Sequence, residues 1–355
     1  MARIVFIGLT MTSSWGNGHA TTYRALIKAL SRRGHEVTFL ERDVSWYRDA
    51  RDLPRSPFCR ILLYRSTEEL KTFAGLVRDA DAVIVGSYVP DGIAVGEWVT
   101  ATAQGTTAFY DIDTPVTLKA LELGVCEYLT GRLARAYQVY FSFTGGSALE
   151  RLRALGSQCP AALYCSVDPE SHAPVSAERQ WELGYLGTYA PDRQPALEAM
   201  LFDVARAMPE RRFVVAGPQY PADTAWPDNA EHISHVSPDK HAAFYCAQDF
   251  TLNLTRSDMR ALGYSPSVRL FEAAACGVPI ISDTWAGLDT IFVPGREILL
   301  AETADEVGHH LRSITASQRR EIAAAARRRV LDTHTALHRA QELERIFHMA
   351  ARKVA

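Results

Sequence analysis

One short segment of the sequence combines residue types that bind the two polar parts of a nucleotide. Residues 265–283 read as a polar loop, an alanine-rich helix that carries Arg269 and Glu272, a Gly-Val-Pro break and a buried strand. An arginine fork binds phosphate oxygens in a bidentate manner, and a helix N-terminus favours phosphate through its unpaired N–H groups and its dipole. A glutamate on the first helical turn can accept hydrogen bonds from the vicinal hydroxyls of a ribose. We therefore expect Ser267 and Arg269 to contact a diphosphate and Glu272 to contact a ribose.

A surface ion pair is the simpler interpretation of Arg269 and Glu272, since they lie within one helical turn, and such a pair contributes little energy. The alanine-rich composition argues against it, because a helix of this kind is usually buried and a buried carboxylate needs partners. Asp283 and Trp285 follow the strand that comes after the helix. We expect both side chains near a bound sugar.

Small residues also follow two other strands in the second half of the chain. Gly187 and Thr188 come directly after the predicted strand at residues 181–186. Gly217 comes directly after the predicted strand at residues 212–216. A small residue and a hydroxyl at the end of a strand could meet a diphosphate, with Arg193 nearby to neutralise its charge. An ordinary exposed loop arginine is the alternative for Arg193.

A glycine-containing loop follows the first apolar strand and ends in a histidine. Gly16 and Gly18 would let the backbone approach a ligand, and His19 would lie at the carboxyl edge of the strand, where open α/β sheets bind ligands. The loop is not a dinucleotide fingerprint, because Thr21 stands at the position of the third glycine. A nicotinamide or flavin cofactor is therefore disfavoured. A tight turn with a capping histidine is the alternative.

Two carboxylates, Asp111 and Asp113, follow the buried strand at residues 107–110. At alternate positions of an extended chain they would point the same way, toward the ligand edge of the sheet. One of them could orient His19 and stabilise its protonated form, so that His19 acts as a general base. The pair could instead hold a divalent metal between two phosphates. For Asp113 alone the alternative is a helix cap, because the Thr-Pro pair that follows it favours a helix start.

Other metal-binding patterns are weak. The six cysteines are scattered with no Cys-x-x-Cys pair, which argues against a zinc site and for reduced thiols in the cytoplasm. His232, His235 and His241 do not have the spacing of a two-histidine helical motif, so we interpret them as loop residues. We expect no bound metal.

These side chains are positioned by an alternation of strands and helices along the whole chain. Strands are predicted at 4–9, 36–40, 82–86, 107–110 and 139–143, and again at 181–186, 212–216, 250–254 and 279–282. Helices are predicted at 21–33, 196–207, 241–247, 270–276 and 317–349. The β-α-β rhythm predicts parallel sheets that are covered on both faces. Residues 161–174 read as a connector, because two prolines interrupt it.

Length and composition bound the class of protein. A chain of 355 residues suits two domains, and a hydrophobic fraction of 47% with a charged fraction of 22% is typical of globular proteins. The net charge of −3 provides no field for nucleic acid or anionic membrane. The N-terminal apolar run is too short for a signal peptide, and no segment reaches the roughly 20 apolar residues of a membrane span. We therefore expect a cytoplasmic protein.

Taken together, the motifs resemble glycosyltransferases of the GT-B type. The resemblance covers nearly the whole chain: Gly18-His19 with residues 31–39 resembles their first strand-loop-helix-strand unit, residues 165–169 their interdomain connector, and residues 271–279 their donor motif. The nearest subgroup is the spore-maturation type, which is related to the large retaining family 4.

This resemblance implies an α/β architecture of two Rossmann-like domains whose parallel sheets face a central cleft. Residues 1–165 would form an acceptor domain, residues 166–335 a nucleotide-sugar donor domain, and residues 336–355 a helix that packs back on the first domain. It implies transfer of a sugar from a nucleoside diphosphate sugar, with a UDP-sugar as the expected co-substrate, to an unidentified acceptor. No cofactor is required, and a divalent metal is allowed but not expected.

The sequence departs from the family pattern at one position that bears on stereochemistry. Retaining relatives carry a glutamate where Tyr264 stands, whereas inverting relatives pair a histidine such as His19 with an aspartate such as Asp111 or Asp113. The resemblance therefore leaves the inverting and retaining courses open. The alternative functions are a nucleotide-sugar epimerase or hydrolase on the same fold, and an inactive nucleotide-sugar-binding protein.

Overall fold

The computed structural model describes residues 1–16 and 18–354, with side chains described as far as residue 350. The chain forms two compact units. The first contains residues 1–14, residues 19–165 and the last helix, α16 (Ala336–Val354); the second contains residues 166–335 and the short segment Trp15–Gly18.

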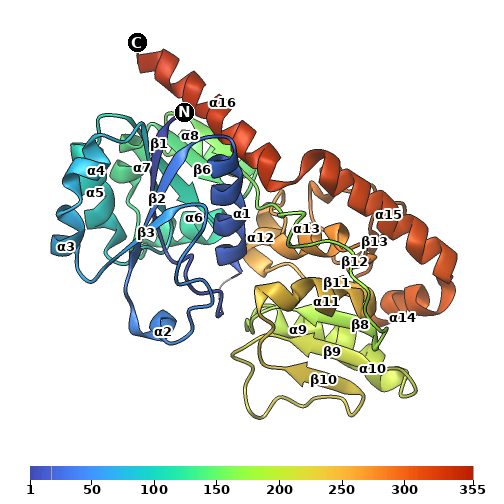
Figure 1. The fold of residues 1–355 in the computed structure, drawn as a ribbon. Helices are drawn as coiled ribbons and strands as arrows, with labels where there is room; N and C mark the ends of the chain where they lie inside the picture. The colour runs from blue at the N-terminus through green and yellow to red at the C-terminus, as the bar shows by residue number, and fades with distance from the viewer. Residues whose placement is uncertain (17, 355) are drawn as a thin grey trace. The chain divides into compact units, whose positions relative to one another are not determined.

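The first unit is built on a parallel sheet of seven strands in the order β3-β2-β1-β4-β5-β6-β7 (Figure 1). The strands are β1 (Arg3–Gly8), β2 (Glu36–Arg42), β3 (Arg60–Tyr64), β4 (Ala82–Gly86), β5 (Thr106–Asp111), β6 (Val139–Ser142) and β7 (Pro160–Ala162). The helices are α1 (His19–Arg32), α2 (Ser45–Arg48), α3 (Thr67–Lys71), α4 (Ala74–Arg78), α5 (Gly92–Thr102), α6 (Thr114–Leu123), α7 (Gly131–Ala136) and α8 (Ser147–Ala154). The inner strands are apolar on both faces, as expected when helices cover both sides of a parallel sheet.

The second unit repeats the same strand order on six parallel strands, β10-β9-β8-β11-β12-β13. The strands are β8 (Trp181–Leu186), β9 (Phe213–Ala216), β10 (Ala230–Ile233), β11 (Gln248–Asn253), β12 (Ile280–Ser282) and β13 (Leu299–Leu300). The helices are α9 (Gln194–Leu197), α10 (Asp203–Ala207), α11 (His241–Cys246), α12 (Ser257–Leu262), α13 (Val268–Ala275), α14 (Ala304–Ser313) and α15 (Ala316–Thr333), with a π-helical turn between α9 and α10.

In each sheet the chain order reverses beside the first strand of the unit. The reversal lies between β1 and β4 in the first sheet and between β8 and β11 in the second. Ligands of open α/β sheets bind at the carboxyl ends of the strands at such a switch point. Each unit therefore offers one location where a ligand is expected.

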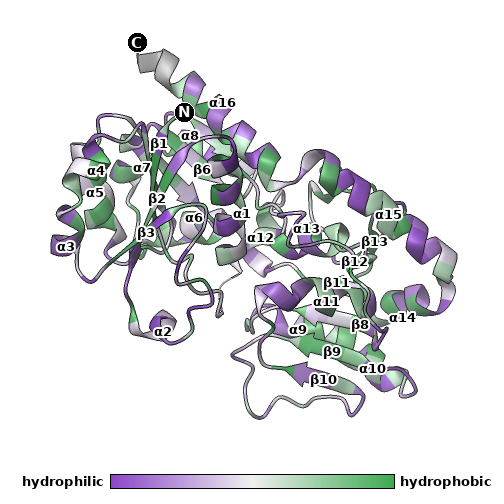
Figure 2. Ribbon diagram, in the orientation of Figure 1, coloured by the Kyte–Doolittle hydropathy of each residue, from purple (hydrophilic) through white to green (hydrophobic). Residues whose placement is uncertain are grey.

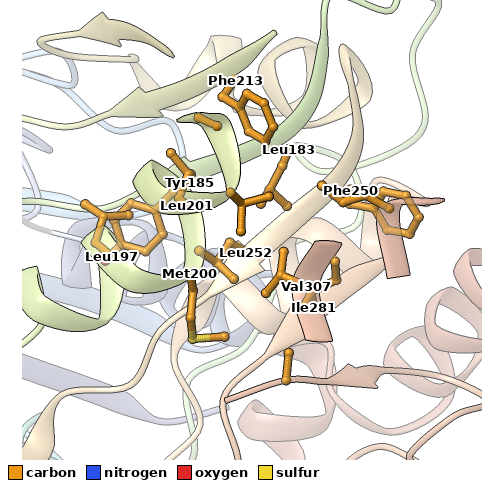
Figure 3. Packing of buried hydrophobic residues seen from close by; sticks show 14 of the residues in the cluster. Leu183, Tyr185, Leu197, Met200, Leu201, Phe213, Phe250, Leu252, Ile281 and Val307 are labelled. Atoms are coloured by element: carbon orange, nitrogen blue, oxygen red, sulfur yellow. The ribbon is translucent and has the colours of Figure 1, made fainter. Parts of the chain in front are cut away.

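The core of the second unit lies between its sheet and the helical stretch that runs from α9 to α10. Figure 3 shows Leu183, Tyr185 and Leu252 of the strands packed against Leu197 and Leu201 of the helices, and all five are almost completely buried. Figure 2 shows the same division in hydropathy, with apolar colour on β8 and β9 and alternating polar and apolar colour along α15 and α16. Burial of a large apolar side chain contributes about 1.5–3 kcal/mol, so this layer holds the strand ends of the second unit in place.

The helix predicted at 317–349 is in fact two helices. α15 ends at Thr333, and the two residues after it run beside Val167, whose N–H donates to the carbonyl of His334 (3.4 Å). His334 has φ −130° and ψ 23°, outside the helical region, so α15 ends at Thr333. α16 then packs on α1 of the first unit, where Glu344 accepts hydrogen bonds from Arg33 Nη2 (2.7 Å) and faces His35 Nε2 (2.8 Å).

None of the helices in the described part of the chain is both long enough and apolar enough to cross a lipid bilayer.

Candidate functional site

The switch point of the second sheet is occupied by the guanidinium of Arg269. Its Nε donates to the carbonyl of Leu186 (2.6 Å), and its Nη1 donates to Asn253 Oδ1 (2.9 Å). Leu186 and Asn253 are the last residues of β8 and β11, so the arginine bridges the two strands that flank the switch point. The guanidinium carbon also lies 4.5 Å from the ring centre of Tyr185, within the range of a cation–π interaction. Arg269 is only 5% exposed, so the surface ion pair with Glu272 is wrong.

The residue before helix α13 also faces this location. Ser267 is the N-cap residue, but its side chain makes no capping bond; its hydroxyl donates instead to Asn253 Oδ1 (2.6 Å). Asn253 thus accepts from both Ser267 and Arg269, and its own amide donates to Ser282 Oγ (2.9 Å). The sequence prediction missed Asn253, although a polar residue at the end of an apolar strand is a signal that could have found it.

Two glycines line the strand ends next to Arg269. A Cβ at Gly217, whose φ is +148°, would collide with the carbonyl oxygen of Gly187. A Cβ at Gly187 would come within 2.8 Å of Arg269 Nη2. Only glycine lets the two loops and the guanidinium approach this closely, which is the backbone accessibility that a phosphate site needs.

Arg193 lies on the loop that follows Gly187. Its Nη2 donates to the carbonyl of Thr188 (2.7 Å), while its Nε is buried without a hydrogen-bond partner among the described residues. The arginine is therefore tied to the strand-end loop, so it is not an ordinary exposed loop residue. The structure brings together five of the predicted diphosphate ligands: Gly187, Thr188, Arg193, Gly217 and Arg269.

Glu272 lies deeper than predicted. Helix α13 begins at Val268, two residues earlier than expected, so Glu272 falls on the second turn and not on the first. The residue is 3% exposed. Its carboxylate accepts from the hydroxyl of Tyr245 (3.3 Å), and its two oxygens lie 3.5 Å from His172 Nε2 and 3.6 Å from His241 Nδ1.

The electrostatics of this buried group differ between its two histidines. Burial lowers the pKa of His172, because it disfavours the charged imidazolium. Burial acts the same way on His241, but the nearby Glu272 carboxylate outweighs it and raises the pKa of His241. Burial and the negative charge of Glu272 both raise the pKa of Tyr245 well above its usual range, which keeps its hydroxyl protonated as a donor.

The prediction that His232 and His241 are loop residues is wrong, because His232 lies in β10 and His241 begins α11. His232 bonds the carbonyl of Gly217 through Nε2 (3.1 Å) and stacks on Trp226 at 4.4 Å between ring centres. His241 belongs with His172 and Glu272, which come from distant parts of the sequence.

Asp283 and Trp285 follow β12 as predicted, but the carboxylate of Asp283 is engaged within the protein. It accepts from the backbone N–H and from the hydroxyl of Thr255, both at 2.9 Å, and burial raises its pKa. Trp285 is 5% exposed, and its indole N–H is buried without a hydrogen-bond partner among the described residues. Asp283 therefore shapes the loop after β11, and Trp285 retains a donor for another group.

In the first unit, the switch point brings His19 near Asp113. His19 is the first residue of α1, and its Nε2 lies 3.9 Å from Asp113 Oδ2, which also accepts from the hydroxyl of Tyr88 (3.0 Å). Asp113 is the N-cap residue of α6, yet its side chain makes no capping bond. Its carboxylate is thus turned toward His19 and Tyr88. Gly16, with a φ of +62°, and Gly18 lie just ahead of α1.

Asp111 does not share this orientation. The chain turns at Ile112, so the strand alternation that would align Asp111 with Asp113 ends there. Asp111 is fully buried, and it accepts from the hydroxyls of Tyr140 (2.6 Å) and Thr117 (2.8 Å). Burial raises its pKa to about 6. The expectation that both carboxylates point the same way is therefore wrong, and Asp113 is the one beside His19.

Comparison with known proteins agrees with this geometry. Residues 193–345 match the model of a family described as glycosyl transferase-like. No curated protein matches the sequence. Over 99% of its length the chain superposes on the whole of a sucrose-phosphate synthase from Thermosynechococcus elongatus, with a TM-score of 0.73 at 15% identity. The chain has the two-domain fold of GT-B glycosyltransferases.

Two further structures share this GT-B fold. HepE from Anabaena, solved in complex with UDP-glucose, aligns with 98% of this chain and 100% of its own at a TM-score of 0.71 and 10% identity. An α-glucosyltransferase solved with UDP and a 13-mer DNA aligns with 98% of this chain and 99% of its own at a TM-score of 0.75 and 15% identity. The family match includes α13 with Arg269 and Glu272, and the ends of β9, β11 and β12, but not the end of β8. The spore-maturation subgroup stays a prediction.

Proposed function

We propose that this protein is a glycosyltransferase that moves a hexose from a UDP-sugar to an acceptor held by its first unit, and that the second unit binds the donor. The observation that carries the proposal is the buried Arg269 at the switch point of the second sheet, next to the backbone of Gly187, with Arg193 tied to the same strand-end loop through Thr188. The UDP and UDP-glucose bound in the similar structures support a UDP-sugar as donor.

The diphosphate would bind at the strand ends of the second unit. Arg269 has two hydrogen bonds to the protein, and its Nη2 has no partner among the described residues, so this nitrogen can donate to a phosphate oxygen. The N-terminus of α13, the backbone of Gly187 and Thr188, and Arg193 would add further donors. When the bond between the anomeric carbon and the diphosphate breaks, these groups stabilise the negative charge on the departing UDP, which is usually the largest protein contribution to such a reaction.

The acceptor hydroxyl would be activated in the first unit. In an inverting course His19 removes its proton as the acceptor oxygen bonds the anomeric carbon, and Asp113 orients the imidazole and stabilises its protonated form. Tyr88 would hold Asp113 through its hydroxyl. Determination of the product anomer by NMR separates this course from a retaining one.

Glu272 is our proposed ligand for the ribose hydroxyls, because it lies on the same helix as Arg269, one turn further on. The test compares Glu272→Ala with the native protein by calorimetry, using UDP and inorganic diphosphate as ligands. We expect weaker binding of UDP and unchanged binding of diphosphate. Equal UDP affinity in the two proteins would remove the ribose assignment.

The activity itself is tested by a thermal-shift screen with UDP-, GDP- and dTDP-sugars, since a ligand that binds only the folded state raises the melting temperature. The sugar that stabilises the protein is then used in product analysis with and without acceptors. Product that forms without an acceptor would indicate an epimerase or hydrolase.

One structural observation favours an inactive nucleotide-sugar-binding protein as the second candidate. Tyr264 stands where retaining relatives carry a carboxylate. Its own backbone φ is +51°, and its ring packs against Gly287. Binding without turnover across a panel of acceptors would support that candidate, and loss of turnover in His19→Ala would exclude it.

A further inference from the structure

We propose that His172, His241 and Glu272 bind a divalent metal ion of the zinc class within the second unit. The three residues come from the segment before β8, from the start of α11 and from the second turn of α13. One ligand atom from each lies within 4.8 Å of the others. The inference rests on this geometry and does not depend on the proposed transfer reaction.

The ring nitrogens of both histidines are available for such an ion. His241 Nε2 faces the carbonyl of Val236 at 3.2 Å. Because a carbonyl only accepts, Nε2 must carry a proton, which leaves Nδ1 to face the Glu272 carboxylate. His241 Nδ1 and both ring nitrogens of His172 are buried, and none of the three has a hydrogen-bond partner among the described residues. Buried polar atoms are rarely left in this state unless something else binds them.

The spacing fits a shared ion better than direct hydrogen bonds. The nitrogen-to-oxygen distances of 3.5 Å and 3.6 Å from Glu272 exceed those of N–H···O hydrogen bonds. Two ligands bound at about 2.1 Å to one tetrahedral ion stand roughly 3.4 Å apart. Each histidine nitrogen therefore lies from a Glu272 oxygen at nearly the separation that a common ion would set, and the group as a whole spans no more than 4.8 Å.

The surroundings supply the outer partners that metal sites in proteins have. A ligating histidine usually donates its second ring N–H to a carbonyl or carboxylate, and a ligating carboxylate is usually hydrogen-bonded. Here Val236 accepts from His241, and Tyr245 donates to Glu272 (3.3 Å). Two imidazoles and one carboxylate are a common zinc donor set, whereas magnesium and calcium prefer oxygen ligands alone.

Metal binding at Glu272 is compatible with the proposed ribose contact. A carboxylate offers about four lone-pair positions and need give the ion only one of them. The site departs from the sequence expectation of no metal, which considered His241 only with its neighbours in sequence. An ion here would join the segment before β8 to α11 and α13. We therefore expect it to stabilise the second unit against unfolding.

The experiment uses the full chain, stripped of metal with a chelator and reloaded with Zn²⁺ or Co²⁺. We expect one equivalent of metal to survive gel filtration, a higher melting temperature with metal than without, and visible absorption bands typical of tetrahedral Co²⁺. His172→Ala and His241→Ala should lose the metal and the temperature shift, whereas the exposed His309→Ala control should keep both.

Measurements on the native protein alone can overturn the proposal, so the test does not depend on whether the variants fold. One refuting result is that the native protein retains less than a tenth of an equivalent of metal and that neither ion changes its melting temperature. The cluster would then hold only a proton between His241 and Glu272. Retention of a full equivalent by folded His241→Ala would overturn it as well. UDP titration of the stripped protein keeps the two proposals distinguishable, since UDP binding without metal retention would leave the proposed function intact.

Discussion

Replacement of Arg269 by lysine tests whether this side chain does more than hold two strands together. An ammonium keeps the charge, but it cannot reach both the Leu186 carbonyl and Asn253 Oδ1, which the guanidinium bonds at 2.6 Å and 2.9 Å. A hydrogen bond from a charged group contributes about 1.5–3 kcal/mol, and the weakened contact with the Tyr185 ring adds roughly 0.5–1 kcal/mol. We therefore expect the free energy of unfolding to fall by about 2–4 kcal/mol, measured by urea denaturation.

The same substitution should weaken binding of UDP. Loss of the charged hydrogen bond from Nη2 to a phosphate oxygen, of similar strength, corresponds to a dissociation constant roughly 10–100-fold higher, measured by calorimetry on the folded variant. Arg327→Lys is the matched control, because Arg327 also donates through Nε to a backbone carbonyl of α13, that of Ala275, at the opposite end of the helix (3.1 Å). The control should bind UDP normally. Native UDP affinity in Arg269→Lys would refute the phosphate role and leave Arg269 a purely structural residue.

Three further outcomes follow from contacts in the first unit. The pKa of Asp111 is about 6 in the folded protein and about 4 in an unfolded chain, so folding favours its protonated form. The stabilisation by Asp111 is complete below about pH 4, and up to about 3 kcal/mol of it is lost as the pH rises to about 6. Asp111→Asn should flatten this pH dependence of the unfolding free energy, measured by urea titrations at several pH values. An unchanged pH dependence would contradict the assignment. Tyr88→Phe removes the hydrogen bond to Asp113 and should lower kcat about tenfold without changing the KM for the donor. A change in KM alone would show that Tyr88 contributes to substrate binding instead. Glu344→Gln weakens the contact with Arg33 and should lower stability by no more than about 1 kcal/mol, less at high salt; a salt-independent loss would point to packing instead.

Much of the fold could be predicted because continuous apolar runs mark the inner strands. The bounds predicted for β4 and β8 agree with the structure, and both strands are buried in the middle of their sheets. The strand β3 was not predicted, because it is partly exposed at a sheet edge and its residues carry no clear alternation. Edge strands bury less apolar surface, so their sequences are less constrained.

The candidate site was predictable in its residue types but not in its contacts. Arg269 was found because an arginine at the start of a helix can bind phosphate oxygens, yet its bond to a backbone carbonyl leaves no mark in the sequence. The start of α13 was misplaced by two residues, which moved Glu272 by just over half a turn. His172 was not identified at all, because its position beside Glu272 depends on how the segment before β8 packs against α13.

The path of the chain affects how the protein is made. The first unit is interrupted by residues 166–335 and completed by α16, whose Phe347 packs on Phe141 at 5.5 Å between ring centres. At about 5–20 residues per second, translation of the intervening segment takes roughly 10–30 s. During that time the surface of the first unit that α16 later covers remains exposed, while the second unit can already fold. Vectorial synthesis therefore favours completion of the C-terminal unit first, and an N-terminal half expressed alone would lack a helix of its own core.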